Sequence, residues 1–425
     1  MNQQPFELPG SYKKWTIGLL VAGVIALLYG FIMYHPFAHV AHGHGAAAHD
    51  AGAGHGDHNS TRFWAVLLQN SVFWLLVVNA SMFFIGVTTL AMGGWQVALR
   101  RVPEAISSVV PVLGIIAFVV LMAIIWGDRT DIFHWLDEEA VKNDKILNGK
   151  KGFLNPVFFT VWSTITIFLW WALGKKMRQL SLDSDKTGPM DYETGKKWIN
   201  KNIIWGSVFI VFFGLTVGST IPWLWLMSID AHWYSTMYSW YTFASSFVSG
   251  MSLIALYIVF LKNRGQLEYV TEEHIHDIGK FMFAFSVFWT YLWFSQYMLI
   301  WYANIPEETG YFKIRVQGPY RGIFFLNLII NFLAPLLILM KRGAKRNWTL
   351  LTVMAVLIIF GHWIDFWQMV MPGTMKEHAQ LMPFEFGIAC LFIGLIMWRV
   401  GAYLTKHPLT AMNHPFLKES MIHHT

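Results

Sequence analysis

The segment 274–308 constrains the fold of this 425-residue chain more than any other. It begins with His276, Asp277 and Lys280 and then carries no charged residue until Glu307. A charge-free run of this length exceeds the roughly 20 residues that an α-helix needs to cross a bilayer. The sequence therefore predicts a membrane-spanning helix here.

This segment is unusual for a helix that faces lipid. At about 100° per residue, Ser286, Thr290, Trp293 and Tyr297 fall on one stripe. Hydroxyl groups have no favourable partner in hydrocarbon, so polar side chains in such helices face the protein interior or a cavity. We expect the stripe to face other helices.

Nine further apolar runs are long enough to cross a bilayer. The residues are 55% hydrophobic and only 13% charged, with a mean hydropathy of +0.43, outside the range of soluble domains. The sequence thus predicts an all-α, multi-pass membrane protein with ten transmembrane helices. The ten runs are 15–34, 64–93, 105–126, 156–174, 203–227, 237–261, 279–301, 323–340, 350–370 and 382–404.

The basic residues indicate the orientation of these helices. With the N-terminus inside, most of the 31 Lys and Arg residues lie in inner loops and tails. Because Lys and Arg in short loops stay cytoplasmic, both termini are predicted to be cytoplasmic. Basic clusters at 175–178 and 341–346 are expected to contact anionic membrane lipids. The net charge of +6 reflects such clusters and gives no reason to expect nucleic-acid binding.

Between the first two runs lies a Gly/Ala/His segment, 35–58, with seven histidines. Its irregular spacing favours a flexible outer loop over a copper or zinc relay, although the relay stays open as an alternative. The single cysteine, Cys390, excludes a disulfide and a CxxCH haem attachment within the chain.

The ninth run carries two titratable residues, His362 and Asp365, three positions apart on one helical face. Asp365 lies about 22 Å above the inner end of the run. An ionised Asp at that depth costs about 2.5–3.5 kcal/mol unless it meets water, a partner or a proton. Glu385 opens the tenth run on the same side, so the three are predicted to form an outer group.

Two further runs carry small or amide side chains. Ser245, Ser249 and Gly250 belong to a small-residue seam in the sixth run that is predicted to pack closely against another helix. Asn327 and Asn331 lie one turn apart before a proline in the eighth run, which predicts a polar kink.

The inner and outer titratable groups, joined by the hydroxyl stripe, have the composition of a proton pathway. The alternative is structural, with Asp277–Lys280 and His362–Asp365 as static pairs. A bis-His haem is disfavoured because only His362 is deep, whereas a quinol site near it stays open. No catalytic, metal or cofactor residue is predicted. The predicted pathway residues are His276, Asp277, Lys280, Ser286, Thr290, Tyr297, His362, Asp365 and Glu385.

Three tracts, EEHIHDIGKFMFAFSVFWTYLWFSQYMLIWYANIPEETGYF, HWYSTMYSWYTFASSFVSG and GHWIDFWQMVMP, carry a family resemblance. They closely resemble a membrane-subunit family of bacterial alternative complex III, a quinol:cytochrome c oxidoreductase, within the NrfD/polysulfide-reductase membrane-subunit superfamily. The likeness covers essentially the whole chain. It implies a first helix and loop (1–62), a four-helix bundle of spans two to five (63–232), a second of spans six to nine (233–380), and a last helix with a cytoplasmic tail (381–425).

The resemblance also implies a function. It indicates a cofactor-free, non-catalytic subunit of the bacterial inner membrane that provides proton half-channels for energy coupling to menaquinol oxidation. Haem c, iron–sulfur clusters and menaquinol are expected on partners: an NrfD-like sister subunit, multihaem and monohaem cytochrome c subunits, an iron–sulfur subunit and, in a supercomplex, a terminal cytochrome oxidase. A structural scaffold without transport and a second quinol-binding subunit stay open as alternatives. The histidine-rich segment does not fit the family pattern.

Overall fold

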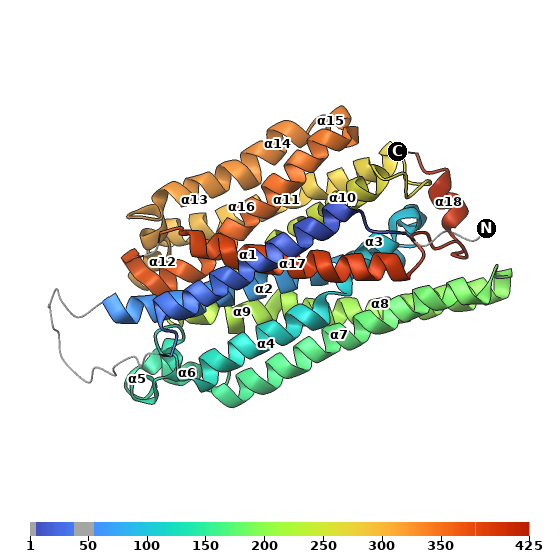
Figure 1. Cartoon of the computed structure of the whole chain (residues 1–425). Coiled ribbons are helices and arrows are strands. Elements are labelled where there is room, and N and C mark those ends of the chain that lie inside the picture. The colour runs from blue at the N-terminus through green and yellow to red at the C-terminus, as the bar shows by residue number, and fades with distance from the viewer. Residues whose placement is uncertain (1–5, 38–54, 379, 425) are drawn as a thin grey trace.

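The computed structural model describes residues 6–37, 55–378 and 380–424, and every regular element in these ranges is a helix. Long helices run side by side through the molecule (Figure 1). Most of the predicted histidine-rich loop falls in 38–54, outside the described residues.

Nine helical stretches within the described ranges are long and apolar enough to cross a membrane. The chain is therefore an all-α, multi-pass membrane protein, as the apolar runs predict. The stretches are α1 (Gly10–Tyr34), α2 (His55–Leu90), α3 with α4 (Arg101–Ser107, Val110–Trp126), α7 (Pro156–Thr187), α8 with α9 (Tyr192–Leu215, Ile221–Trp225), α10 (Met237–Lys262), α13 with α14 (Arg321–Leu328, Ala334–Leu339), α16 (Trp348–Met375) and α17 (Pro383–Lys406).

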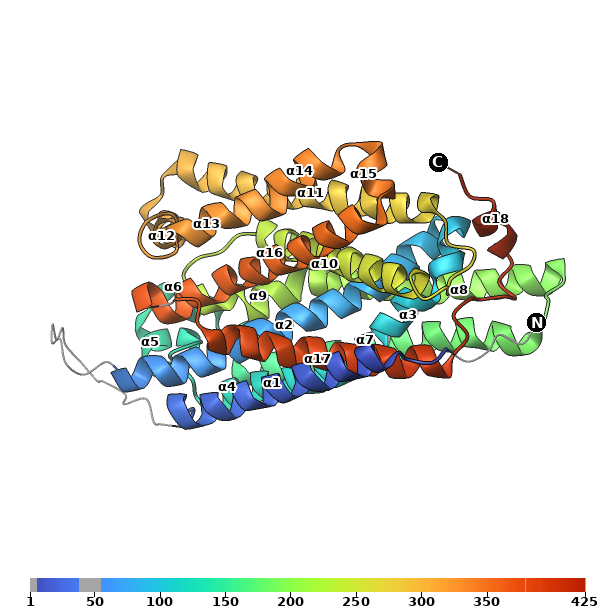
Figure 2. The same cartoon turned by 45° about the horizontal axis from the view of Figure 1, so that its top comes forward.

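The remaining predicted span forms one helix of 32 residues, α11 (Glu272–Ala303), which is not among these nine. Tryptophans, tyrosines and polar residues such as Gln296 lower its mean hydropathy. At 1.5 Å per residue α11 is about 48 Å long, more than the thickness of a hydrocarbon core. It runs beside α10 and α14 (Figure 2).

Two of the nine stretches contain a π-helical turn that ends two positions before a proline. These turns are Thr216–Thr220, followed by Pro222, and Ile329–Leu333, followed by Pro335. Proline lacks an N–H group and its ring clashes with the preceding turn, and a wider turn relieves both problems. The second turn lies at the kink that the sequence predicts in this span.

The two central helices are α2 and α10. In an apolar 18-residue segment of each helix, 83% and 89% of the residues are buried, respectively. They pack on each other at Gly250, where an added Cβ would lie 3.0 Å from the Ala80 side chain. The small-residue seam thus allows close packing, as predicted. Helices α2, α4, α7 and α8 contact one another in a ring, and α10, α11, α13–α14 and α16 form a second ring. Helix α1 pairs with α17 along one side.

Short helices distinguish the two ends of the molecule. The loop end carries α5 (Glu138–Asn143), α6 (Lys145–Lys150) and α12 (Pro306–Val316). The opposite end, called the terminal end, carries α15 (Arg342–Arg346), α18 (Leu417–Met421) and the described residues that precede α1 (Figure 1).

Candidate functional site

Asp365, in the middle of α16, is fully buried and accepts four hydrogen bonds. Its Oδ1 accepts one from the Tyr241 hydroxyl and one from Asn327 Nδ2 at 2.8 Å. Its Oδ2 accepts one from Ser245 Oγ at 3.0 Å and one from Trp289 Nε1 at 2.9 Å. The donors come from α10, α11 and α13, so four helices of the second ring meet at one carboxylate. These five residues with His362 are called the Asp365 cluster.

His362 lies one turn from Asp365, with its Nδ1 2.9 Å from Ser245 Oγ and 3.8 Å from Asp365 Oδ2. The Ser245 hydroxyl has one proton, which it donates to Asp365, so Nδ1–H of His362 donates to Ser245. The Nε2 atom is then a bare acceptor. It is buried and has no hydrogen-bond partner among the described residues. The predicted His362–Asp365 pair is therefore linked through Ser245, and one ring nitrogen is available for a proton.

A small polar cavity of about 20 Å³ adjoins Tyr241 on the side facing the loop end. Gln296, Arg315 and Gln368 line it, and each has a buried nitrogen without a hydrogen-bond partner among the described residues. A cavity of this size with several polar partners suits a single water molecule. A protonatable carboxylate thus lies one tyrosine away from a polar cavity.

A larger pocket of about 580 Å³, called the vestibule, opens at the loop end and shares Tyr311 with the small cavity. Tyr311 stacks on Trp233 at 3.8 Å between ring centroids and under the Arg315 guanidinium at 3.4 Å. Asp230 also lines the vestibule, and its Oδ2 lies 3.9 Å from Arg315 Nη2. Burial raises the pKa of the Asp230 carboxyl, and the charge of Arg315 offsets part of that increase. The vestibule therefore leads from the loop end to within one side chain of the cavity.

At the terminal end, Asp277 is nearly fully buried and is the centre of a second group. It pairs with Lys280 at 2.5 Å, with His423 Nε2 at 2.7 Å and with His276 Nδ1 at 3.9 Å. The three residues that the sequence predicts here do come together. His423 arrives from the C-terminal segment, which the sequence indicates only as a tail.

Removing the His423 imidazole is expected to loosen the C-terminal segment. In a His423→Ala protein, Asp277 loses its hydrogen bond with His423 Nε2, and hydrogen bonds to charged groups contribute about 1.5–3 kcal/mol. We expect amide hydrogen exchange in 417–424 to speed up roughly 10- to 150-fold. The matched control is His424→Ala, whose side chain is exposed. Equal exchange in both variants would show that the contact with Asp277 does not hold the segment.

Glu385 does not contact His362 or Asp365. It pairs with Arg62 of α2 at 2.5 Å and accepts a hydrogen bond from the Met382 backbone amide at 3.0 Å at the start of α17. Both charged side chains are buried. The sequence analysis singles out Glu385 but not Arg62, whose only signal in the sequence is a single charge at the beginning of a span.

The buried face of α11 is rotated from the predicted stripe. Ser286 is fully buried, and its hydroxyl has no partner among the described residues. Thr290 donates only to the Ser286 carbonyl oxygen of its own helix at 2.8 Å, and Tyr297 is half-buried. Besides Ser286, the side chains with polar atoms that point inward in this part of α11 are Trp289 and Gln296. Because both fall within the aromatic-rich run, the sequence does not single them out.

A second buried charge cluster lies near the terminal end of α3 and α7. Glu104 accepts hydrogen bonds from Arg100 Nε at 3.0 Å and Arg101 Nη1 at 2.7 Å, and Arg101 also pairs with Asp185. Arg178 donates to Ser107 Oγ at 2.9 Å beside them. We call these residues the arginine cluster. In the sequence, these arginines resemble ordinary basic residues at a membrane boundary.

Among the described residues, no group of three His, Cys, Asp or Glu side chains is arranged to hold a metal ion. No model of a known protein family matches the chain, and no curated protein matches it.

Proposed function

We propose that this chain is the cofactor-free, non-catalytic membrane subunit of a menaquinol:cytochrome c or menaquinol:oxidase oxidoreductase, and that it provides proton half-channels for energy coupling. The observation that carries the transport part is Asp365, a fully buried carboxylate held by four helices beside a polar cavity. Intramembrane carboxylates with polar access typically mark ion or proton pathways.

The half-channel from the loop end begins at the vestibule. Protons enter beside Asp230, pass the polar cavity at Gln296 and Gln368, and reach Asp365 through the Tyr241 hydroxyl. Each step joins groups that share a cavity or a hydrogen bond. The hydroxyl of tyrosine both accepts and donates a proton in a hydrogen bond, so it can relay one.

The half-channel from the terminal end begins at Asp277 and its partners. On α11, Ser286 lies between Asp277 and Trp289 of the Asp365 cluster, and its hydroxyl has no partner among the described residues; within the cluster, His362 Nε2 also has none. Among the described residues, no chain of hydrogen bonds joins the Asp277 group to the Asp365 cluster. This interruption is what two half-channels separated by a dry barrier require. The Asp365 cluster is therefore the proposed point at which protons change sides.

The topology that accompanies this proposal has ten spans, which are the nine apolar stretches of the fold and α11. The two helix rings correspond to the proposed four-helix bundles, and α1 and α17 to the flanking helices. The terminal end is proposed to be cytoplasmic in a bacterial inner membrane. The resemblance to the alternative complex III membrane subunits supplies the proposed partners, which are cytochrome c, iron–sulfur and NrfD-like subunits and a terminal oxidase.

Charge-neutral replacement tests the proposal. In membranes with the assembled complex, Asp365→Asn and Asp277→Asn are expected to lower the number of protons moved per electron, while quinol oxidation continues. The control is Glu272→Gln, an exposed acid at the start of the same helix as Asp277. An unchanged proton-to-electron ratio in both variants would reject transport.

A structural scaffold is the second candidate function. The observation that favours it is the complete set of donors around Asp365, which satisfies an ionised carboxylate without any proton transfer. In that case both asparagine variants would lower the amount of assembled complex and leave its coupling unchanged.

A further inference from the structure

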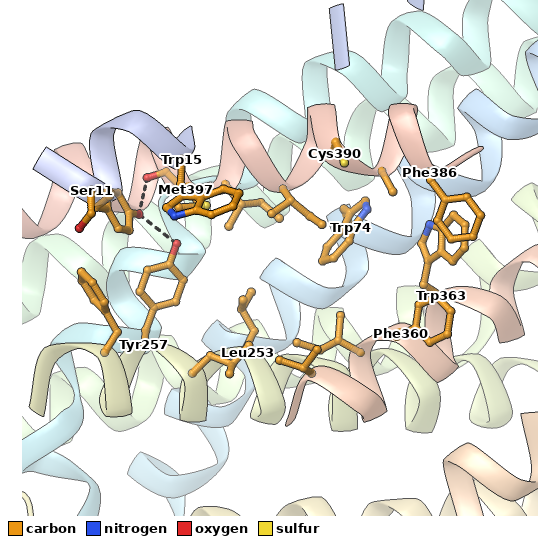
Figure 3. Close-up of a pocket in the computed structure, with 18 residues that line it drawn as sticks. Ser11, Trp15, Trp74, Leu253, Tyr257, Phe360, Trp363, Phe386, Cys390 and Met397 are labelled. Atoms are coloured by element: carbon orange, nitrogen blue, oxygen red, sulfur yellow. Dashed lines mark hydrogen bonds between the residues drawn. The ribbon is translucent and has the colours of Figure 1, made fainter. Parts of the chain in front are cut away.

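A large cavity of about 640 Å³ lies between the α1–α17 pair on one side and α2, α10 and α16 on the other (Figure 3). Its wall is almost entirely aromatic and aliphatic. The few polar groups include the Tyr12 and Tyr257 hydroxyls, 3.2 Å apart, and Tyr12 already donates to the Met397 carbonyl oxygen. A cavity with this lining suits a hydrocarbon chain and offers little to a polar ligand.

The cavity is elongated along the helices. Ser11, Trp15 and Tyr257 line one end, and Trp363 and Phe386 line the other (Figure 3). On α17 the cavity extends from Met397 to Phe386, which is about 16 Å at 1.5 Å per residue. This length matches one leaflet of hydrocarbon, about half of the 30 Å core. The cavity thus begins at Ser11, in the first turn of α1 at the terminal end, and ends at Phe386, one turn from the start of α17.

Unpaired positive charge lies at the surface end of the cavity. Lys14 is exposed in the first turns of α1 beside Ser11 and Trp15. The Arg264 guanidinium lies 6.0 Å from the ring centroid of Phe260, which lines the cavity. Neither cation has a carboxylate partner within the described ranges. Basic side chains at this level attract anionic headgroups by about 1 kcal/mol each.

We propose that this cavity binds one acyl chain of an anionic phospholipid from the leaflet at the terminal end, with its phosphate at Lys14 and Arg264. The bound chain fills the space between the α1–α17 pair and the second helix ring. Its tip lies against Trp363 of α16. This proposal does not depend on proton transport.

The only cysteine of the chain, Cys390, lines the cavity and provides the assay. The full chain is purified in detergent, stripped of lipid and reacted with a small apolar maleimide. Dioleoyl phosphatidylglycerol is expected to slow Cys390 labelling at least fivefold, and to do so at lower concentration than dioleoyl phosphatidylcholine. Lys14→Ala with Arg264→Ala is expected to remove this preference, while labelling without lipid stays unchanged.

The matched control is Lys13→Ala, because Lys13 is equally exposed but points away from the cavity face of α1. It should keep the preference for phosphatidylglycerol. Two outcomes overturn the proposal. One is labelling that no phospholipid slows. The other is protection by an isoprenoid quinone at concentrations where phosphatidylglycerol gives none, which would assign the cavity to a quinone.

Discussion

A Glu104→Ala protein is expected to lose about 3–5 kcal/mol of stability. Glu104 is fully buried and bridges Arg100 and Arg101, which are buried as well. Without its carboxylate the cluster holds three buried guanidinium groups and one remaining acid, Asp185. Uncompensated buried charge is costly because ions leave water at a high free-energy penalty.

Thermal unfolding in detergent, followed by tryptophan fluorescence, measures this loss. The matched control is Asp183→Ala, which breaks an exposed pair with Lys186 on α7, and exposed pairs contribute about 1 kcal/mol or less. Glu104→Gln keeps an acceptor of the same shape and should fall between the two. If Glu104→Ala unfolds at the control's temperature, water must solvate the arginines or a bound anion must neutralise them, and their charges are not left uncompensated.

The membrane-spanning helices follow from the sequence because a bilayer imposes a length on every apolar run. The ends of the helices do not follow in the same way. Residues 156–174 are apolar, but α7 continues to Thr187. Leaving the bilayer ends the need for apolar side chains, whereas backbone hydrogen bonding continues wherever the residues tolerate a helix. The apolar run therefore predicts the buried part of a helix rather than its full length.

The candidate site follows from the sequence only where its members share a helix. Spacing alone predicts His362 and Asp365 as a pair, and likewise Asp277 and Lys280. Contacts between helices depend on the rotation and depth of each helix, which the periodicity of one segment leaves undetermined. Arg62 and Glu385 are 323 positions apart, and their pairing depends on such packing.

The undetermined rotation of each helix also explains why the buried face of α11 differs from the predicted stripe. Ser286, Thr290 and Tyr297 share a stripe by geometry, but aromatic residues surround the helix and give no clear apolar face. The neighbouring helices bury Ser286 together with Trp289 and Gln296, and leave Thr290 and Tyr297 half-buried. Asp365 supplies the acceptor that Trp289 needs, so this contact with α16 stabilises the rotation of α11 in which Trp289 is buried.

Replacing Asp365 by alanine is expected to destabilise the second helix ring by about 3 kcal/mol or more. The substitution leaves Tyr241, Trp289 and Asn327 with buried donors and no acceptor, at roughly 1–3 kcal/mol for each. Asp365→Asn keeps one oxygen for Tyr241 and Asn327, but its amide group meets the indole N–H of Trp289. It should cost about half as much in the same unfolding measurement.

A double-mutant cycle separates these donors from general packing. In the Asp365→Ala background, Trp289→Phe removes an N–H group that is already unpaired. The stability loss of the double mutant should therefore be about 0.5–3 kcal/mol smaller than the sum of the two single-mutant losses. Thr290→Val is the control, because that hydroxyl bonds only within α11, and it should change stability by less than about 0.5 kcal/mol. An Asp365→Ala protein as stable as the unmodified chain would mean that water reaches all three donors. The cluster would then be hydrated, and the dry barrier between the two proposed half-channels would have to lie elsewhere.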